Sequence, residues 1–254
     1  MVAPRTRELV GPSRRGERKD YRCERLPLAD GGQADVFKAV HKPSGEVVIL
    51  KKLKDKYAPG RQVARMRREI ECGRSLVGNP HAMPVLDFDP KHTWFVMPYA
   101  EATAESCLKE FSDDAALREL LESLCSVLAG AHRIGWIHRD IKPANVSRLK
   151  GRWVLADWGI VRRPLGHTTD PQRTRAGVFL GSEGFAAPEH YSDAHHVGPA
   201  ADIYSLGQLI GWAVTGETPL VNVPLLPKSG PWRAIVREAT QRDPERRPAT
   251  VSEP

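Results

Sequence analysis

The run of residues 137–146, I-H-R-D-I-K-P-A-N-V, constrains this chain more than any other stretch. It places an acid at Asp140, a cation at Lys142 and an amide at Asn145. Such groups can orient a hydroxyl, neutralise charge on a moving phosphoryl group and hold a divalent metal. A second carboxylate follows at Asp157, within a D-W-G triplet. An isolated H-R-D triplet arises by chance, but the complete run followed by D-W-G does not, so the two motifs predict a site for phosphoryl transfer to a hydroxyl.

The motifs stand in the order typical of the eukaryotic-type serine/threonine protein kinases, and the chain resembles that family over roughly residues 20 to 250. The resemblance implies an α+β, bilobal protein-kinase-like fold, with a small β-rich N-lobe that holds one main helix and a larger, mostly α-helical C-lobe. It implies ATP-dependent transfer to Ser or Thr hydroxyls of proteins, with ATP and Mg²⁺ as cofactors and Mn²⁺ as an alternative metal. The catalytic residues it implies in the C-lobe are Asp140, Lys142, Asn145 and Asp157, with Asn145 and Asp157 as metal ligands. The Arg-rich composition suggests a bacterial member.

Hydrophobic patterns divide the chain into a β-rich part and a helical part. Apolar, β-branched runs at 36–40 and 47–50 flank a K-P-S-G turn and predict a hairpin, and 85–88 and 94–97 predict two further strands. Helical spacing covers 61–76, and the nearly all-apolar stretch 202–215 predicts a buried central helix. The expected organisation is a flexible basic tail at 1–20, an N-lobe at 21–97, a hinge at 98–101 and a C-lobe at 102–254.

The end of the C-lobe is expected to be reduced. Residues 218–231 are rich in Pro and show no helical period, so the helix that the family has there is expected to be missing or shortened to a turn. The chain ends soon after Arg247-Pro248, where a last helix should begin, which leaves either an early end or a fragment of a longer protein.

In the N-lobe, the resemblance assigns Lys51 to grip the ATP phosphates and Glu69 to pair with it, with Glu71 as the competing acid. Alternation along a strand directs the neighbouring Lys52 to the opposite face. The phosphate-covering loop, L-A-D-G-G-Q-A-D-V at 28–36, is the weakest match, because Ala replaces two of the family's glycines. The resemblance implies these nucleotide-binding residues: Leu28, Ala29, Gly31, Gly32, Val36, Ile49, Lys51, Met97, Pro98, Ala100 and Ser147.

Several of these positions depart from the family pattern. Ile49 replaces a small alanine and Ser147 replaces a leucine, which predicts altered packing around the adenine. Pro98 lacks an N–H, which the hinge tolerates because the family uses a carbonyl there and takes its N–H from the position of Ala100. Trp158 replaces the usual Phe while Gly73 replaces a bulky apolar residue, so we expect the larger ring to fill the space above Gly73.

The segment from Asp157 to Glu189 contains three threonines that are candidates for autophosphorylation: Thr168, Thr169 and Thr174. A phosphate there would pair with nearby arginines, Arg139 among them, and order the segment. The alternative is that these threonines are ordinary loop residues. The resemblance also implies four structural supports: Ser182 beside the catalytic pair, Asp202 under the catalytic loop, and Arg247 paired with Glu189.

Composition limits the remaining alternatives. With 254 residues, 41% hydrophobic and 27% charged, the chain reads as globular, and it has no apolar run long enough to cross a bilayer. Four scattered cysteines favour no disulfide framework, so a reducing cytoplasm is expected. The net charge of +7 favours an Arg-rich surface over a nucleic-acid partner. The expected partners are a protein substrate and a second copy of the chain. A pseudokinase scaffold, a small-molecule kinase of related fold and a nucleic-acid-binding module are the competing functions.

Overall fold

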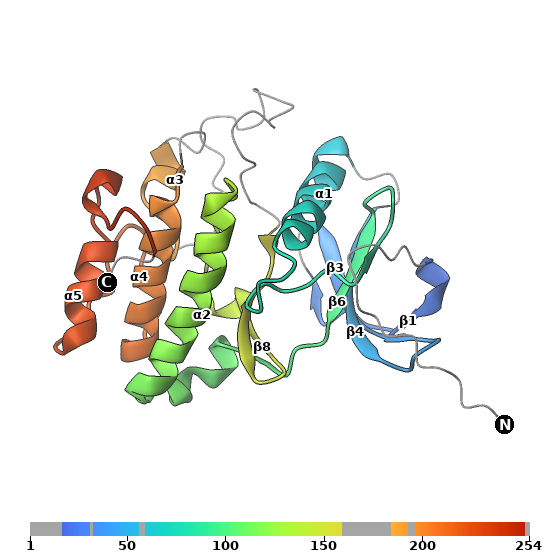
Figure 1. The fold of residues 1–254 in the computed structure, drawn as a ribbon, viewed down its shortest axis with the longest axis horizontal. Coiled ribbons are helices and arrows are strands. Elements are labelled where there is room, and N and C mark those ends of the chain that lie inside the picture. The colour runs from blue at the N-terminus through green and yellow to red at the C-terminus, as the bar shows by residue number, and fades with distance from the viewer. Residues whose placement is uncertain (1–16, 31–32, 56–58, 159–183, 193–196, 252–254) are drawn as a thin grey trace. The chain divides into compact units, whose positions relative to one another are not determined.

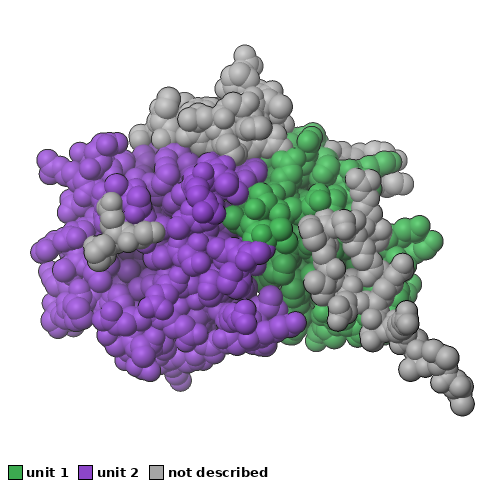
Figure 2. Space-filling view, in the orientation of Figure 1, with its two compact units in different colours: residues 1–77, 83–100 green, residues 78–82, 101–254 purple. Residues whose placement is uncertain are grey.

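The computed structural model describes residues 17–30, 33–55, 59–158, 184–192 and 197–251. The chain divides into two compact units, Met1–Val77 with Met83–Ala100, and Gly78–Ala82 with Glu101–Pro254, which Figure 2 colours separately. The described part of unit 1 contains a sheet and one long helix, and that of unit 2 is mostly helical. The α+β, bilobal kinase-like fold expected from the sequence is therefore confirmed.

Unit 1 is built on a six-stranded antiparallel sheet in which the strand order is β1-β3-β4-β6-β5, with β2 beside β3 (Figure 1). Strands β3 and β4 form the expected hairpin, and Gly45 in its turn has a φ of 74°, a left-handed angle that glycine adopts at little cost. The strands are β1 (Tyr21–Cys23), β2 (Ala29–Asp30), β3 (Ala34–His41), β4 (Val47–Leu53), β5 (Asp87–Phe88) and β6 (Trp94–Pro98).

Side chains alternate between the two faces of this sheet because successive residues of a strand point in opposite directions. On one face, Val48 and Leu50 of β4 pack with Val96 and the ring of Tyr21. On the other face, Leu53 and Phe95 pack against helix α1 (Gly60–Ser75) through Met66 and Ile70. Lys51 lies opposite Val36 and Phe95 in the strand register and so belongs to the face that α1 covers.

The described part of unit 2 contains four α-helices, and α2, α4 and α5 stand side by side in Figure 1. Helix α4 is buried over nearly its whole length, as its uniformly apolar sequence predicts. Helix α2 is capped by Asp113, whose carboxylate accepts the N–H of Ala115 at 3.1 Å. The helices are α2 (Asp114–Arg133), α3 (Glu189–Ser192), α4 (Ala200–Thr215) and α5 (Pro231–Ala239).

A small sheet joins β7 (Ala102–Thr103), β8 (Val146–Leu149) and β9 (Arg152–Leu155). Short 3₁₀ turns are η1 (Arg18–Asp20), η2 (Glu105–Ser112), η3 (Pro143–Asn145) and η5 (Pro244–Arg246).

Two segments differ from the sequence expectation in ways that have physical causes. Within the expected flexible tail, Arg18–Asp20 forms a 3₁₀ turn, because the Arg18 guanidinium donates to the carbonyl of Tyr21 at 2.8 Å. Residues 78–82 lie with unit 2, not with the sheet of unit 1 that surrounds them in sequence. There His81 bonds the backbone of β9, accepting the N–H of Leu155 on its carbonyl at 2.8 Å.

Three further features of the described residues concern membrane spans, cysteines and the connection between α4 and α5. None of their helices combines the length and the apolar character needed to cross a bilayer. All four cysteines fall in the described part, and none of them forms a disulfide there. Residues 217–230, which connect α4 to α5, form turns and bends but contain no helix.

Candidate active site

The part of the candidate site in unit 1 is centred on a buried ion pair. Strand β4 carries Lys51 and helix α1 carries Glu69 one and a half turns before its end, and both side chains lie on the shared face. The Lys51 ammonium contacts both carboxylate oxygens of Glu69, at 2.8 and 3.0 Å. The two side chains are only 15% and 7% exposed, so the charges are largely shielded from water and hold each other in place.

The nearby lysine Lys52 and the nearby acid Glu71 point away from the Lys51–Glu69 pair, so neither takes the place of a member of the pair. Lys52 lies on the opposite face of β4, where its ammonium stacks over the ring of Phe37. Glu71 bonds Arg67 at 2.7 Å on the outer side of α1. The sequence favoured Glu69 over the competing Glu71, and in the structure it is Glu69 that contacts Lys51.

The residues expected to bind nucleotide are spread along β2, β3, β4 and β6 and on β8. Ile49 faces the same side of β4 as Lys51 and lies opposite Met97 in the register, while Val36 lies opposite Lys51. Leu28 is exposed just before β2, Pro98 ends β6, and Ala100 follows two residues later. Ala29 pairs with Val36 across the β2–β3 hairpin. Ser147 is buried on β8 of unit 2, and Gly31 and Gly32 lie outside the described residues.

The part in unit 2 gathers Asp140, Lys142 and Asn145 on the loop that precedes β8. The Asn145 amide donates to the backbone carbonyl of Asp140 at 2.8 Å and to its carboxylate at 3.1 Å. The Lys142 ammonium lies 3.4 Å from the same carboxylate. The three residues that the sequence assigned to chemistry therefore form one contact group around the Asp140 carboxylate.

His138 is a further site residue to which the sequence reasoning gave no role. Its ring is fully buried, its Nδ1 atom lies 3.3 Å from the backbone N–H of Asp140, and its Nε2 atom lies 3.0 Å from the carbonyl of Ala156. The tautomer that carries its proton on Nε2 satisfies both contacts, because Nδ1 then accepts and Nε2 donates. His138 thus connects the backbone of the catalytic loop to the residue before Asp157. Its place two residues before Asp140 was the available signal.

Asp202 of α4 supports the catalytic loop from below. Its carboxylate accepts the backbone N–H of His138 at 2.9 Å and that of Arg139 at 2.8 Å. His132, at the end of α2, lies 2.8 Å from the same carboxylate and was also missed by the sequence reasoning. Burial by itself raises the pKa of Asp202, but the hydrogen bond and charge of His132, with His138 and the Arg139 amide, outweigh it and lower the pKa below the ordinary value.

Two residues of the site hold unusual backbone angles. Arg139 has a φ of 72° and Asp157 a φ of 58°, in the left-handed region that side chains other than glycine rarely adopt. Arg139 is fixed there by the bond of its N–H to Asp202. Such local strain persists where surrounding contacts hold it and is frequent at functional sites.

The expected contact of Trp158 with Gly73 would join the two units and stays a prediction, and within unit 1 a neighbouring side chain already lies beside Gly73. A Cβ atom built on Gly73 would come 2.8 Å from the Val85 side chain, and Val85 therefore supplies the missing volume. Trp158 packs edge-on against His138, with ring centres 4.5 Å apart, and its indole N–H donates to the carbonyl of Leu155. The sequence could not foresee Val85 because it follows Gly73 by twelve residues through an irregular turn.

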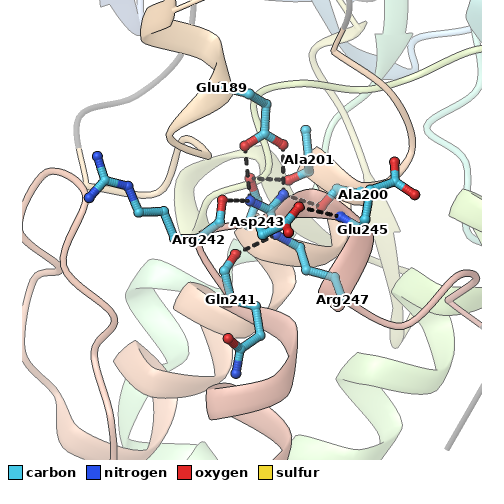
Figure 3. A network of polar contacts seen from close by, with 9 residues as sticks. Glu189, Ala200, Ala201, Gln241, Arg242, Asp243, Glu245 and Arg247 are labelled. Atoms are coloured by element: carbon cyan, nitrogen blue, oxygen red, sulfur yellow. Dashed lines mark hydrogen bonds and ion pairs between the residues drawn. The ribbon is translucent and has the colours of Figure 1, made fainter.

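Arg247 and Glu189 form a buried network that Figure 3 shows from close by. The Arg247 guanidinium donates to the two carboxylate oxygens of Glu189 at 2.6 and 2.9 Å. Its remaining donors reach the backbone carbonyls of Gln241, Ala200 and Arg242. The network ties α3, α4 and the segment before η5 together.

The remaining expected residues fall outside the described part of the chain. These are the candidate phosphorylation sites Thr168, Thr169 and Thr174, and the support residue Ser182.

The oxygen atoms present suit a hard divalent metal. The amide oxygen of Asn145 is not used by the two bonds that its nitrogen makes to Asp140, and Asp157 supplies a carboxylate nearby in sequence. The described residues contain no group of three or more His, Cys, Asp or Glu side chains that could cage a metal.

The chain belongs to the protein kinase domain family, whose pattern it matches over residues 25–247. Among curated relatives it is 30% identical over 246 residues to the probable serine/threonine-protein kinase PkwA of Thermomonospora curvata, covering 88% of this chain and 32% of the relative. It is 32% identical over 202 residues to the serine/threonine-protein kinase PknL of Mycobacterium tuberculosis, covering 77% and 49%. It is 29% identical over 202 residues to AfsK of Streptomyces coelicolor, another kinase of this type, covering 76% and 24%. The chain thus spans less than half of the length of each of these relatives.

Proposed function

We propose that this chain transfers the γ-phosphoryl group of ATP to Ser and Thr hydroxyls of proteins. The contact group around Asp140 carries the proposal. Its carboxylate can accept the proton of a substrate hydroxyl, and Lys142, 3.4 Å from it, can neutralise charge on the phosphoryl group in transfer. The names of the relatives, all serine/threonine kinases, support the same acceptor class.

The buried Lys51–Glu69 pair supports a role in holding the ATP phosphates. A lysine kept in one position by a carboxylate holds its ammonium in place before the phosphate arrives, so little order is lost when a phosphate binds. We assign Asn145 and Asp157 as the residues that would hold Mg²⁺, or Mn²⁺ in its place, which shields the phosphate charge when bound. The rest of the nucleotide contacts are those assigned from the family resemblance.

Autophosphorylation at Thr168, Thr169 or Thr174 is part of the proposal. Transfer from one copy to another requires a transient encounter between two chains, so the rate per molecule should rise with protein concentration. We assign the reaction to the cytoplasm, where ATP is available and where four cysteines that form no disulfide in the described part of the chain suit a reducing medium. No nucleic-acid partner is proposed.

The test is to incubate the purified chain with γ-labelled ATP and Mg²⁺, with a parallel sample in Mn²⁺, and to analyse the labelled amino acids after hydrolysis. The proposal predicts phosphoserine or phosphothreonine, and labelled peptides that contain one of the three threonines. Label on tyrosine alone would contradict the proposed acceptor. If nucleotide binds without any transfer in either metal, the chain is instead a nucleotide-binding scaffold.

A further inference from the structure

Unit 2 contains a pocket of about 750 Å³ that none of the assigned catalytic residues lines. Its walls come from four segments that are distant in sequence: residues 188–191 at α3, Tyr204 of α4, residues 222–226 of the connection between α4 and α5, and residues 237–244 at the end of α5. A recess of this size accommodates several side chains of a bound peptide.

The connection that forms one wall is held firmly against α4. The buried amide of Gln208 donates to the carbonyl of Val223 at 3.0 Å and accepts the N–H of Leu225 at 2.9 Å. Gly211 permits the close approach, because a Cβ atom there would lie 2.2 Å from the carbonyl oxygen of Leu225. The wall is therefore preorganised, although it contains no helix, and a ligand would lose little affinity to ordering it.

The same connection exposes an apolar strip next to the pocket. Leu220, Val221 and Val223 are 70%, 41% and 49% exposed, and the residues beside them in sequence, Asn222 and Pro224, line the pocket. Single exposed apolar residues are common, but three within four positions at the edge of a recess are typical of an interaction site.

The charge around the pocket is positive. Arg237 and Arg242 line it, both are exposed, and neither forms an ion pair with a carboxylate of the described residues. Glu189, the acid in the wall, is already neutralised by Arg247. The hydroxyl of Tyr204, another wall residue, is buried and has no hydrogen-bond partner among the described residues, so the wall also holds an unused donor. These features favour a ligand rich in acceptors and negative charge.

The net charge of the whole chain favours an acidic partner protein over a second copy of the chain as the ligand of this pocket. A chain with a net charge of +7 is repelled by a second copy of itself at a basic surface, so self-association through this face is disfavoured. An acidic segment of another protein is attracted to the same surface.

We propose that this pocket docks an acidic peptide segment of a partner protein, with carboxylates at Arg237 and Arg242 and a large apolar side chain over the strip Leu220–Val223. The inference goes beyond phosphoryl transfer, because docking needs neither ATP nor the residues around Asp140. It would give the kinase a way to select proteins by a segment remote from the hydroxyl that receives phosphate.

The test measures binding of fluorescein-labelled peptides to the full chain without nucleotide, by fluorescence anisotropy at low salt. The probe is G-S-E-D-L-E-F-D-S-G, and two relatives of it replace the four acids by lysine or the two apolar residues by serine. The acidic apolar peptide should bind, the lysine peptide should not, and the serine peptide should bind more weakly. Failure of the first peptide to bind, or equal binding of all three, would overturn the proposal.

Two double variants test whether the peptide binds at this pocket. The double charge reversal Arg237→Glu/Arg242→Glu should weaken binding about tenfold. The matched control Arg22→Glu/Arg152→Glu, which makes the same change of net charge at two exposed strand residues, should leave it within about twofold. An equal loss in both doubles would show attraction to overall charge and refute a defined site. Label transfer from ATP onto the chain itself should be unchanged in both double variants, so a failure of docking and a failure of the kinase proposal are told apart.

Discussion

The guanidinium of Arg247 is completely shielded from solvent and grips the carboxylate of Glu189 with two parallel hydrogen bonds. Its other donors are used by backbone carbonyls (Figure 3). Its Cζ atom lies 5.0 Å from the centre of the Tyr204 ring. A buried charge held in this way is costly to leave without its partner.

Replacing Arg247 by Lys should therefore lower the free energy of unfolding by about 3–5 kcal/mol, because an ammonium cannot supply five donors in a planar fork. The neighbouring Arg246→Lys is the matched control, since Arg246 is exposed and should change stability by no more than about 0.5 kcal/mol. Urea unfolding of the two variants measures both losses in the free energy of unfolding. Similar small losses in both would show that the network contributes little.

Asp202→Asn should also destabilise the chain, by about 3 kcal/mol near neutral pH, because the carboxylate is buried and bonds His132 and two backbone amides. The pKa of Asp202 is lower in the folded state than the ordinary 3.8. Its contribution is then fully present above the unfolded pKa and is lost as the pH falls through the folded pKa.

The stability gap between wild type and Asp202→Asn should accordingly narrow as the pH is lowered from about 7 towards 2. Unfolding curves at a series of pH values give this gap directly. A gap that stays constant down to the acid end would mean that folding does not shift the pKa of Asp202, which would contradict the lowered pKa.

Tyr204 offers a prediction at high pH. Burial is the largest cause that raises its pKa, to about 12, although the nearby Arg247 lowers it. Because the pKa of Tyr204 is higher in the folded state, its neutral phenol contributes to the free energy of unfolding at pH values below the ordinary pKa of 10. This contribution is lost as the pH rises through the folded-state pKa. Phenolate absorbance should show one tyrosine that ionises late, and Tyr204→Phe should remove that late step while leaving the others unchanged.

Lys51 and Lys52 form a natural matched pair on opposite faces of β4. Lys51→Met should reduce phosphate transfer by about 10²- to 10³-fold, the range found when one preorganised charged donor is removed. Lys52→Met should change the transfer rate by less than about twofold, because its ammonium stacks on Phe37. Equal losses in both variants would mean that general charge, and not the pair with Glu69, supports transfer.

The same comparison applies on helix α1. Glu69→Gln should reduce transfer because it releases the Lys51 ammonium, whereas Glu71→Gln breaks an exposed contact with Arg67 and leaves the Lys51–Glu69 pair intact. Rates measured at saturating ATP distinguish an effect on chemistry from one on nucleotide affinity.

The sequence predicted those parts of the molecule that depend on local pattern. The buried helix at 202–215 follows from its uniform apolar character, and the helix at 61–76 from its spacing, since each pattern has one structural solution. The grouping of Asp140, Lys142 and Asn145 follows from their closeness in one loop.

What the sequence could not give depends on contacts between distant segments. The bond of His132 to Asp202 joins positions 70 residues apart, and no periodicity marks it. Val85 takes the space beside Gly73 because an irregular turn brings it there, which apolar patterning does not encode. The pocket near α5 likewise arises from four separate segments.

The most direct test of the central claim compares phosphate transfer by the wild-type chain and by Asp140→Asn, with ATP binding measured on the same samples. Asparagine keeps the shape of the side chain but cannot accept the hydroxyl proton as a carboxylate does. The account predicts label on Ser or Thr of the wild-type protein, a loss of at least about 10²-fold in the variant, and nucleotide binding by both. Equal transfer by the two proteins would contradict the role assigned to Asp140, and with it the proposed mechanism.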